Sequence, residues 1–364
     1  MPRINFEINA RGEVDWVNGI LEYDNVEPIL LDTLKEKIMT LAHAKYLDDE
    51  IHDAKLLSII DEKDKSQIPL AKEELIFLYE IDKEINYFGY EKDPRIAEIK
   101  SRRDCKQDIA TIYDCEKENV ATSISDFDTG KISIFFGYLN YEGNELPETF
   151  RKLRGVIGTA HFPNLLSAIN LSSLEWTKDS LYISKVVKSD GLGNLNYVGG
   201  SLFADSLVEA LCLSNLEYIG GRAGFKNLVM STGLGKLRYI GGGASFINLI
   251  SASDMGNLES IGYNRRGQDT FLREKAMFHN LTKADGLGKL KAIYILSEFP
   301  SLEDARAFGG VLEELWDGVD FSSLESKEGL ENVKLVHRGG LGLDSESLID
   351  YLNSKQPSTM YRIK

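Results

Sequence analysis

The amino-acid sequence predicts an α+β domain followed by a β-solenoid of about eight coils. In the second half of the chain, apolar residues recur every 21 positions and glycines follow them in register, whereas the first part shows helical periodicity. At 364 residues the chain is also too long for one ordinary core. We place the acidic α+β domain at 1–145, the solenoid at 146–335 and a C-terminal cap at 336–364.

The first domain is expected to begin and end with a β-hairpin. Residues 4–8 and 14–16 alternate apolar and polar positions around Ala10-Arg11-Gly12, which favours an N-terminal hairpin. Three segments with helical spacing follow, at 28–47, 53–61 and 70–88. A further helix should begin at Asp93-Pro94, an N-cap followed by proline, and run to about Cys115. The last two strands, at 119–126 and 131–138, should form a hairpin that closes the end of the solenoid.

The repeat that defines the solenoid is L-x-x-L-x-x-[IV]-G. Its second leucine recurs at Leu174, Leu195, Leu216, Leu237 and Leu258. A second pattern in phase with it, A/L-x-F-x-N/S-L, contains Phe225, Phe246, Phe278, Phe299 and Phe321. A coil of 21 residues is too short to hold a strand, two turns and a full helix, so its return limb should be extended or 3₁₀.

Each coil is expected to contribute the same three features. Alternating residues such as Ala223 and Phe225 should point inward from a short strand. Glycine pairs such as Gly220-Gly221 should form the sharp corner before that strand. An Asn or Ser at one fixed place per coil should hydrogen-bond to backbone groups of the adjacent coil, so that stacked copies form a ladder. Because no coil buries its core alone, stability should accumulate by stacking.

Two segments carry a family resemblance, LSNLEYIGGRAGFKNL (213–228) and LGKLRYIGGGASFINL (234–249). They resemble the leucine-rich-repeat superfamily in a short bacterial-type version, and the strand after the I-G-G corner is also similar to the coils of receptor L-domains. The resemblance covers about half of the chain. It implies recognition of a protein or another ligand and names no partner, and the N-terminal domain resembles no family.

Charge and motif content argue against several function classes. The net charge is −15, most of it in residues 1–140, which makes nucleic acid a poor partner. The five histidines and three cysteines show no CxxC, HxH or HExxH spacing, so we expect no metal and no cofactor. No apolar run suits a signal peptide or a membrane span, and the few cysteines suit a reducing compartment. A cytoplasmic protein is therefore expected, with export without a cleaved signal as the alternative.

The predicted binding residues point outward from the strands of the solenoid. They are Tyr182 and Phe203 on adjacent coils, Arg222 and Lys226 on the next coil, and Met277 and His279 further along. Exposed aromatic residues beside an arginine are typical of binding hot spots. The 263–274 insertion, with Arg265 and Arg266, should project from the binding face. The alternative is ordinary surface, or surface that another part of the chain covers.

We therefore predict no catalytic residue and a protein-recognition function, carried by the strand sheet and the 263–274 insertion. One alternative is an enzyme or exported effector with its active site in residues 1–150 and the solenoid as a targeting module. A deep pocket converging on perturbed carboxylates or on Cys115 would indicate it. The other alternative is a structural subunit of a larger assembly, which predicts large apolar surface patches.

Overall fold

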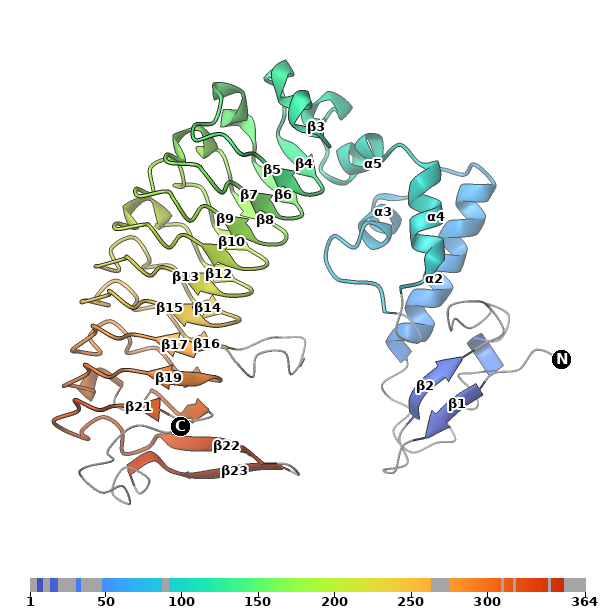
Figure 1. The fold of residues 1–364 in the computed structure, drawn as a ribbon. Coiled ribbons are helices and arrows are strands. Elements are labelled where there is room, and N and C mark those ends of the chain that lie inside the picture. Colours follow the sequence, from blue (N-terminus) through green and yellow to red (C-terminus); the bar gives the residue numbers. More distant parts are fainter. Residues whose placement is uncertain are drawn as a thin grey trace. The chain divides into compact units, whose positions relative to one another are not determined.

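The computed structural model describes residues 5–8, 14–18, 31–33, 48–86, 92–262, 275–308, 311–316, 319–339 and 342–349 (Figure 1). Its contacts divide the chain into two units, Met1–Lys117 and Glu118–Lys364. The first unit therefore ends upstream of residue 145, because the segment after Lys117 already pairs with the solenoid.

The first unit contains one hairpin and several helices. Strands β1 (Asn5–Ile8) and β2 (Val14–Asn18) pair antiparallel, as predicted. The helices whose full bounds lie within the described residues are α2 (Asp48–Lys65), α3 (Lys72–Leu78), α4 (Pro94–Arg102) and α5 (Cys105–Ile112). Of the helix expected at 28–47, only residues 31–33 lie within the described part of the chain, and they are helical.

The helix expected from Asp93 to Cys115 is two helices. It begins as predicted, since the Asp93 side chain accepts a hydrogen bond from the Arg95 N–H at 3.0 Å. It ends at Arg102 because Arg103 adopts an extended backbone and Asp104 caps a new helix, accepting from the Gln107 N–H at 3.2 Å. A second N-cap inside a helical pattern ends the first helix.

The second unit is a parallel β-solenoid of about nine turns in residues 134–335. Each regular coil supplies one short strand to each of two sheets. In the described part of the chain the first sheet comprises β3 (Val120–Ala121), β4 (Ile134–Phe136), β6 (Gly155–Ile157), β8 (Trp176–Thr177), β10 (Tyr197–Val198), β12 (Tyr218–Ile219), β14 (Tyr239–Ile240), β16 (Ser260–Ile261), β18 (Ala292–Ile293), β20 (Glu314–Trp316), β22 (Lys334–Gly339) and β23 (Gly342–Ser347).

The second sheet comprises β5 (Leu139–Asn140), β7 (Ala160–His161), β9 (Leu181–Tyr182), β11 (Leu202–Phe203), β13 (Ala223–Gly224), β15 (Ala244–Ser245), β17 (Lys275–Met277), β19 (Leu296–Glu298) and β21 (Val319–Asp320). The third side of each coil is the return limb. As expected for coils of this length, it is extended or 3₁₀. Its 3₁₀ turns include η7 (Ile169–Leu171), η8 (Leu211–Leu213) and η9 (Arg306–Phe308).

The segments expected to form the last hairpin of the first domain belong to the solenoid. Val120 of β3 pairs with Ile134 of β4 in parallel, not antiparallel, so the hairpin prediction is wrong. The chain between them forms the 3₁₀ helix η5 (Ile124–Thr129), which provides the length that a parallel connection needs. Two further 3₁₀ helices flank this region, η4 (Lys117–Asn119) and η6 (Glu148–Lys152).

The core is a set of columns in which each residue lies on its counterpart in the next coil. The phenylalanines of the second pattern are fully buried, as predicted. Their rings stack at 5.4 Å from Phe225 to Phe246, 5.3 Å from Phe246 to Phe278 and 4.9 Å from Phe278 to Phe299. The parallel register keeps identical positions in contact, as in the pairs Ala223↔Ala244 and Ala244↔Ala276.

Hydrogen bonds between coils follow the same register. The asparagine ladder is of two kinds. Asn164 Nδ2 donates to the backbone carbonyl of Glu142 in the preceding coil at 3.0 Å, as expected. Further along, it joins side chain to side chain: Asn248 Nδ2 donates to Asn227 Oδ1 at 3.2 Å, and Asn280 Nδ2 to Asn248 Oδ1 at 3.3 Å. At the C-terminal end, β22 and β23 form an antiparallel hairpin on the last coil. The expected cap from residue 336 therefore includes most of this hairpin.

Candidate functional site

The predicted aromatic residues lie side by side on the second sheet. Tyr182 of β9 and Phe203 of β11 are paired in register, and their rings stack with centroids 4.9 Å apart. His161, one coil earlier, meets the Tyr182 ring edge-on at 5.2 Å. Both Tyr182 and Phe203 are half-buried, and they point outward because Leu181 and Leu202 occupy the inward positions. This column is the geometry expected from the 21-residue spacing.

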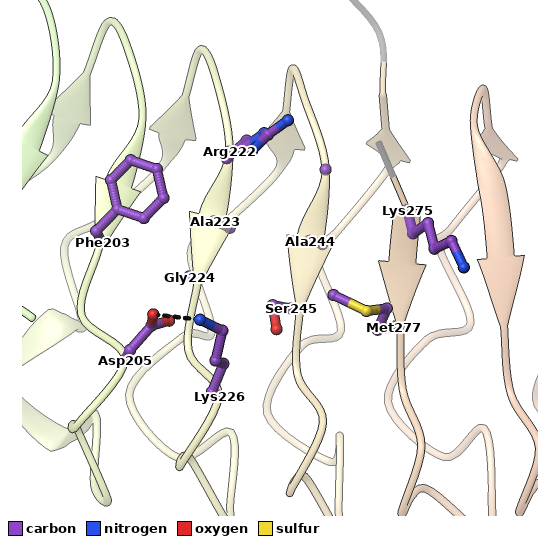
Figure 2. Close-up of a pocket in the computed structure, with 11 residues that line it drawn as sticks. Phe203, Asp205, Arg222, Ala223, Gly224, Lys226, Ala244, Ser245, Lys275 and Met277 are labelled. Carbon is purple, nitrogen blue, oxygen red and sulfur yellow. Dashed lines mark hydrogen bonds and ion pairs between the residues drawn. The ribbon is translucent and has the colours of Figure 1, made fainter. Parts of the chain in front are cut away.

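Two small residues continue the column and leave a hollow. Gly224 and Ser245 follow Phe203 in register, and Met277 comes next (Figure 2). The hollow over these two residues measures about 230 Å³ and lies between the Phe203 ring and the Met277 side chain. A Cβ atom on Gly224 would lie 2.8 Å from Asp205 Oδ1 and 3.2 Å from the Phe203 ring, so glycine keeps this space open.

Charged side chains surround the hollow. Three cations line it, namely Arg222, Lys226 and Lys275, against one carboxylate, Asp205. Lys226 Nζ donates to Asp205 Oδ2 at 2.7 Å, as Figure 2 shows, and Lys275 Nζ donates to Glu298 Oε1 at 2.5 Å. On a chain of net charge −15, this is a local excess of positive charge.

The remaining predicted residues lie elsewhere. The Nε2 of His279 is 2.8 Å from Glu298 Oε2, so this side chain faces Glu298 and does not line the hollow. Burial alone would raise the pKa of Glu298, but hydrogen bonds from Lys275 and His279 hold it below its ordinary value. Arg265 and Arg266, with the rest of the 263–274 insertion, lie outside the described residues.

An exposed apolar row on the third side was not predicted. Five successive coils expose an aliphatic side chain at the same position, each between 36% and 57% exposed: Leu166, Val187, Val208, Val229 and Ile250. Leu211 and Met230 lie beside this row and are exposed as well. The signal was present in the sequence, because these residues also recur every 21 positions, directly after an inward residue.

The first unit contains a network of ion pairs around a surface depression. Arg102 binds Asp61 and Asp64, and Arg103 binds Asp64 and Asp108. Burial would raise the pKa of Asp64, yet hydrogen bonds from the two arginines lower it, so this carboxylate stays ionised. A paired, ionised carboxylate of this kind stabilises structure and does not serve as a general acid.

The cysteine of the enzyme alternative is in an unfavourable setting. Burial, and then the neighbouring Asp114 charge, raise the pKa of the Cys115 thiol. A cysteine nucleophile needs a lowered pKa, since the thiolate is the reactive form. Glu50 at the start of α2 has a raised pKa because of burial, but it does not line the depression near Arg102 and Arg103. In the described part of the chain, no group of three or more His, Cys, Asp and Glu side chains is placed to hold a metal ion.

Comparison with known proteins finds no matching family model, no matching curated protein and no matching solved structure. No helix within the described ranges has the length and apolar character needed to cross a bilayer.

Proposed function

We propose that this protein recognises another protein through the second sheet of its solenoid. The observation that carries the proposal is the stacked pair Tyr182–Phe203 beside a hollow with Arg222 at its edge. Aromatic residues and arginine dominate binding energy at protein interfaces, where they surround or fill small desolvated pockets. The short parallel coils are compatible with a repeat-type solenoid. The sequence resemblance to the leucine-rich-repeat superfamily implies that such a solenoid recognises a partner.

The size of the hollow favours a protein partner over a small molecule. Ligand pockets usually measure about 300–1,000 Å³ and enclose most of the ligand. At about 230 Å³ and open to solvent, this hollow is smaller than that range and suits one side chain of a larger partner. The net charge of −15 works against nucleic acid, because phosphate binding depends on an excess of Lys and Arg.

The proposal is tested by affinity capture from native lysate. We expect the wild type to capture a protein that the triple variant Tyr182→Ala, Phe203→Ala, Arg222→Ala loses. These side chains lie on the surface, so each single substitution should lower the free energy of unfolding by about 1 kcal/mol or less. Mass spectrometry identifies the partner, and circular dichroism checks that the variant is folded.

The first sheet offers a matched control. Tyr197 and Tyr218 stack at 5.0 Å on adjacent coils, and Arg154 is exposed directly before β6 of the same sheet. The triple variant Tyr197→Ala, Tyr218→Ala, Arg154→Ala likewise removes two aromatic rings and one guanidinium group, and it should still capture the partner. If both triple variants lose it equally, or neither does, the second sheet is not the recognition surface.

The apolar row on the third side favours a second candidate function, a structural subunit. A contiguous exposed apolar patch on a soluble protein usually marks an interface. The row reads Leu–Val–Val–Val–Ile from Leu166 to Ile250, nearly the same in both directions. A two-fold interface requires a self-complementary patch, so the occupant we consider is a second copy of this chain.

Light scattering after size exclusion tests this candidate. We expect a mass of twice the 40.8 kDa chain for the wild type, and the single-chain mass for the double variant Val187→Glu, Val208→Glu. Ile68→Glu is the control, because Ile68 is equally exposed in the first unit, and it should leave the mass unchanged. A wild-type monomer at every concentration would contradict the subunit candidate.

A further inference from the structure

The hollow contains two buried polar atoms that have no hydrogen-bond partner among the described residues. They are Oγ of Ser245, whose residue is 8% exposed, and Oδ1 of Asp205. Buried polar atoms in native proteins are nearly always paired, so an unpaired one indicates a group that the structure lacks. A ligand that accepts a hydrogen bond from the Ser245 hydroxyl and donates one to the Asp205 carboxylate would satisfy both atoms.

The charges around the hollow indicate that the accepting group is an anion. Three cations line it, namely Arg222, Lys226 and Lys275. Arg222 is exposed at the edge of the hollow. A guanidinium group presents parallel N–H donors that match the two oxygens of a carboxylate.

The apolar side chains that line the hollow favour a ligand with an apolar group between its polar groups. Phe203 closes one end of the hollow with its ring and Met277 the other end with its thioether, as Figure 2 shows. A methionine adapts its shape to an apolar neighbour. The ligand therefore combines an apolar side chain, a carboxylate and an N–H donor within the volume of about one residue.

We propose that the hollow binds the C-terminal residue of the partner protein, and that this residue has an apolar side chain. The side chain lies between Phe203 and Met277, and its α-carboxylate accepts from Ser245 Oγ and Arg222. Its backbone N–H donates to Asp205 Oδ1. This inference rests on the proposed recognition function. An internal residue with an apolar side chain has no carboxylate, and an internal aspartate or glutamate, which has one, lacks the apolar side chain.

The test uses the full chain with ¹³C-methyl-labelled methionine and N-acetyl-L-leucine as the probe. The Met277 signal, one of six, is assigned from the Met277→Leu variant. We expect a saturable shift of this signal. N-acetyl-leucinamide, which lacks the carboxylate, should bind about tenfold more weakly, and Arg222→Gln should weaken N-acetyl-leucine about tenfold. Ser245→Ala should weaken it severalfold, and Lys188→Gln on the third side should leave it unchanged.

Three outcomes would overturn the inference. Equal binding of the acid and the amide would assign the hollow to an internal segment of the partner. Tighter binding of free leucine than of N-acetyl-leucine would assign it to a free amino acid. No shift at all would leave the hollow without this ligand.

The failure of this inference can be separated from the failure of the proposed function. If the wild type captures a C-terminally amidated partner as well as the unmodified one, the inference fails while recognition by the second sheet stands. If N-acetyl-leucine binds but the Tyr182, Phe203, Arg222 triple variant captures the partner normally, the recognition proposal fails instead.

Discussion

Phe246→Asp should unfold several coils of the solenoid together. Phe246 is fully buried and stacks on Phe225 and Phe278 in the neighbouring coils. An unpaired carboxylate at this point would lose the packing of the column and be buried without a partner, at a cost of more than about 4 kcal/mol. Because each coil is stabilised by its neighbours, the loss should spread along the stack.

Hydrogen exchange is the measurement for this substitution. Amides in the strands around Phe246 should lose protection, whereas those of α2 to α5 in the first unit should keep it. Ile247→Asp is the matched control, since Ile247 follows Phe246 and points outward, partly exposed. It should lower stability by about 1 kcal/mol or less. Equal effects of the two substitutions would mean that unfolding does not depend on the inner column.

Gly220→Ala is the second substitution with a large expected effect. A Cβ atom on Gly220 would lie 2.0 Å from the carbonyl oxygen of Gly199 in the preceding coil. Because that oxygen belongs to the backbone, the two coils must move apart. We expect a loss of about 2–4 kcal/mol, measured as the free energy of unfolding in urea.

Gly256→Ala provides the comparison. A Cβ atom on Gly256 has no heavy atom within 4 Å, and its backbone is not left-handed. Replacement of such a glycine by alanine should be neutral or stabilise by about 0.4–1 kcal/mol, because the unfolded chain loses freedom. Equal destabilisation of both variants would contradict this explanation. The regular spacing of the repeat's glycines would then reflect the backbone preference of glycine and not the close approach of neighbouring coils.

The Gly220-Gly221 corner shows where the sequence reading was incomplete. The sequence predicts this pair as the sharp corner that leads into the strand, because glycine allows a wide range of backbone conformations. Neither glycine has a left-handed backbone, and Cβ atoms on them would collide with the preceding coil. The sequence of one coil does not reveal this collision, because the colliding atoms belong to two stacked coils.

The inner columns could be predicted because a fixed period places identical positions on top of one another. The hollow could not be predicted in the same way. Gly224 pairs with Phe203 and Ser245 with Met277, as the repeat requires, but empty space depends on how the large side chains lean, which the repeat does not determine. Lys275 was missed because it follows the insertion, where the 21-residue period is interrupted.

The β3–β4 connection illustrates a different limit. Two alternating apolar segments around Asp126–Gly130 fit a hairpin as well as they fit two turns of a solenoid, since both place one face inward. The direction of pairing is decided by the 3₁₀ helix η5. Asp126 accepts hydrogen bonds from the backbone N–H groups of Thr122 and Ser123 and so fixes its start.

The insertion at 263–274 leaves the strand register intact. Ala244 pairs with Ala276 across it in the second sheet, and Ile261 pairs with Ile293 in the first. The chain can thus gain or lose residues between β16 and β17 without disturbing the buried columns. This connection is therefore a site where an inserted sequence is tolerated. A peptide tag or a new recognition segment can be added there, by engineering or by evolution, while the rest of the solenoid stays unchanged.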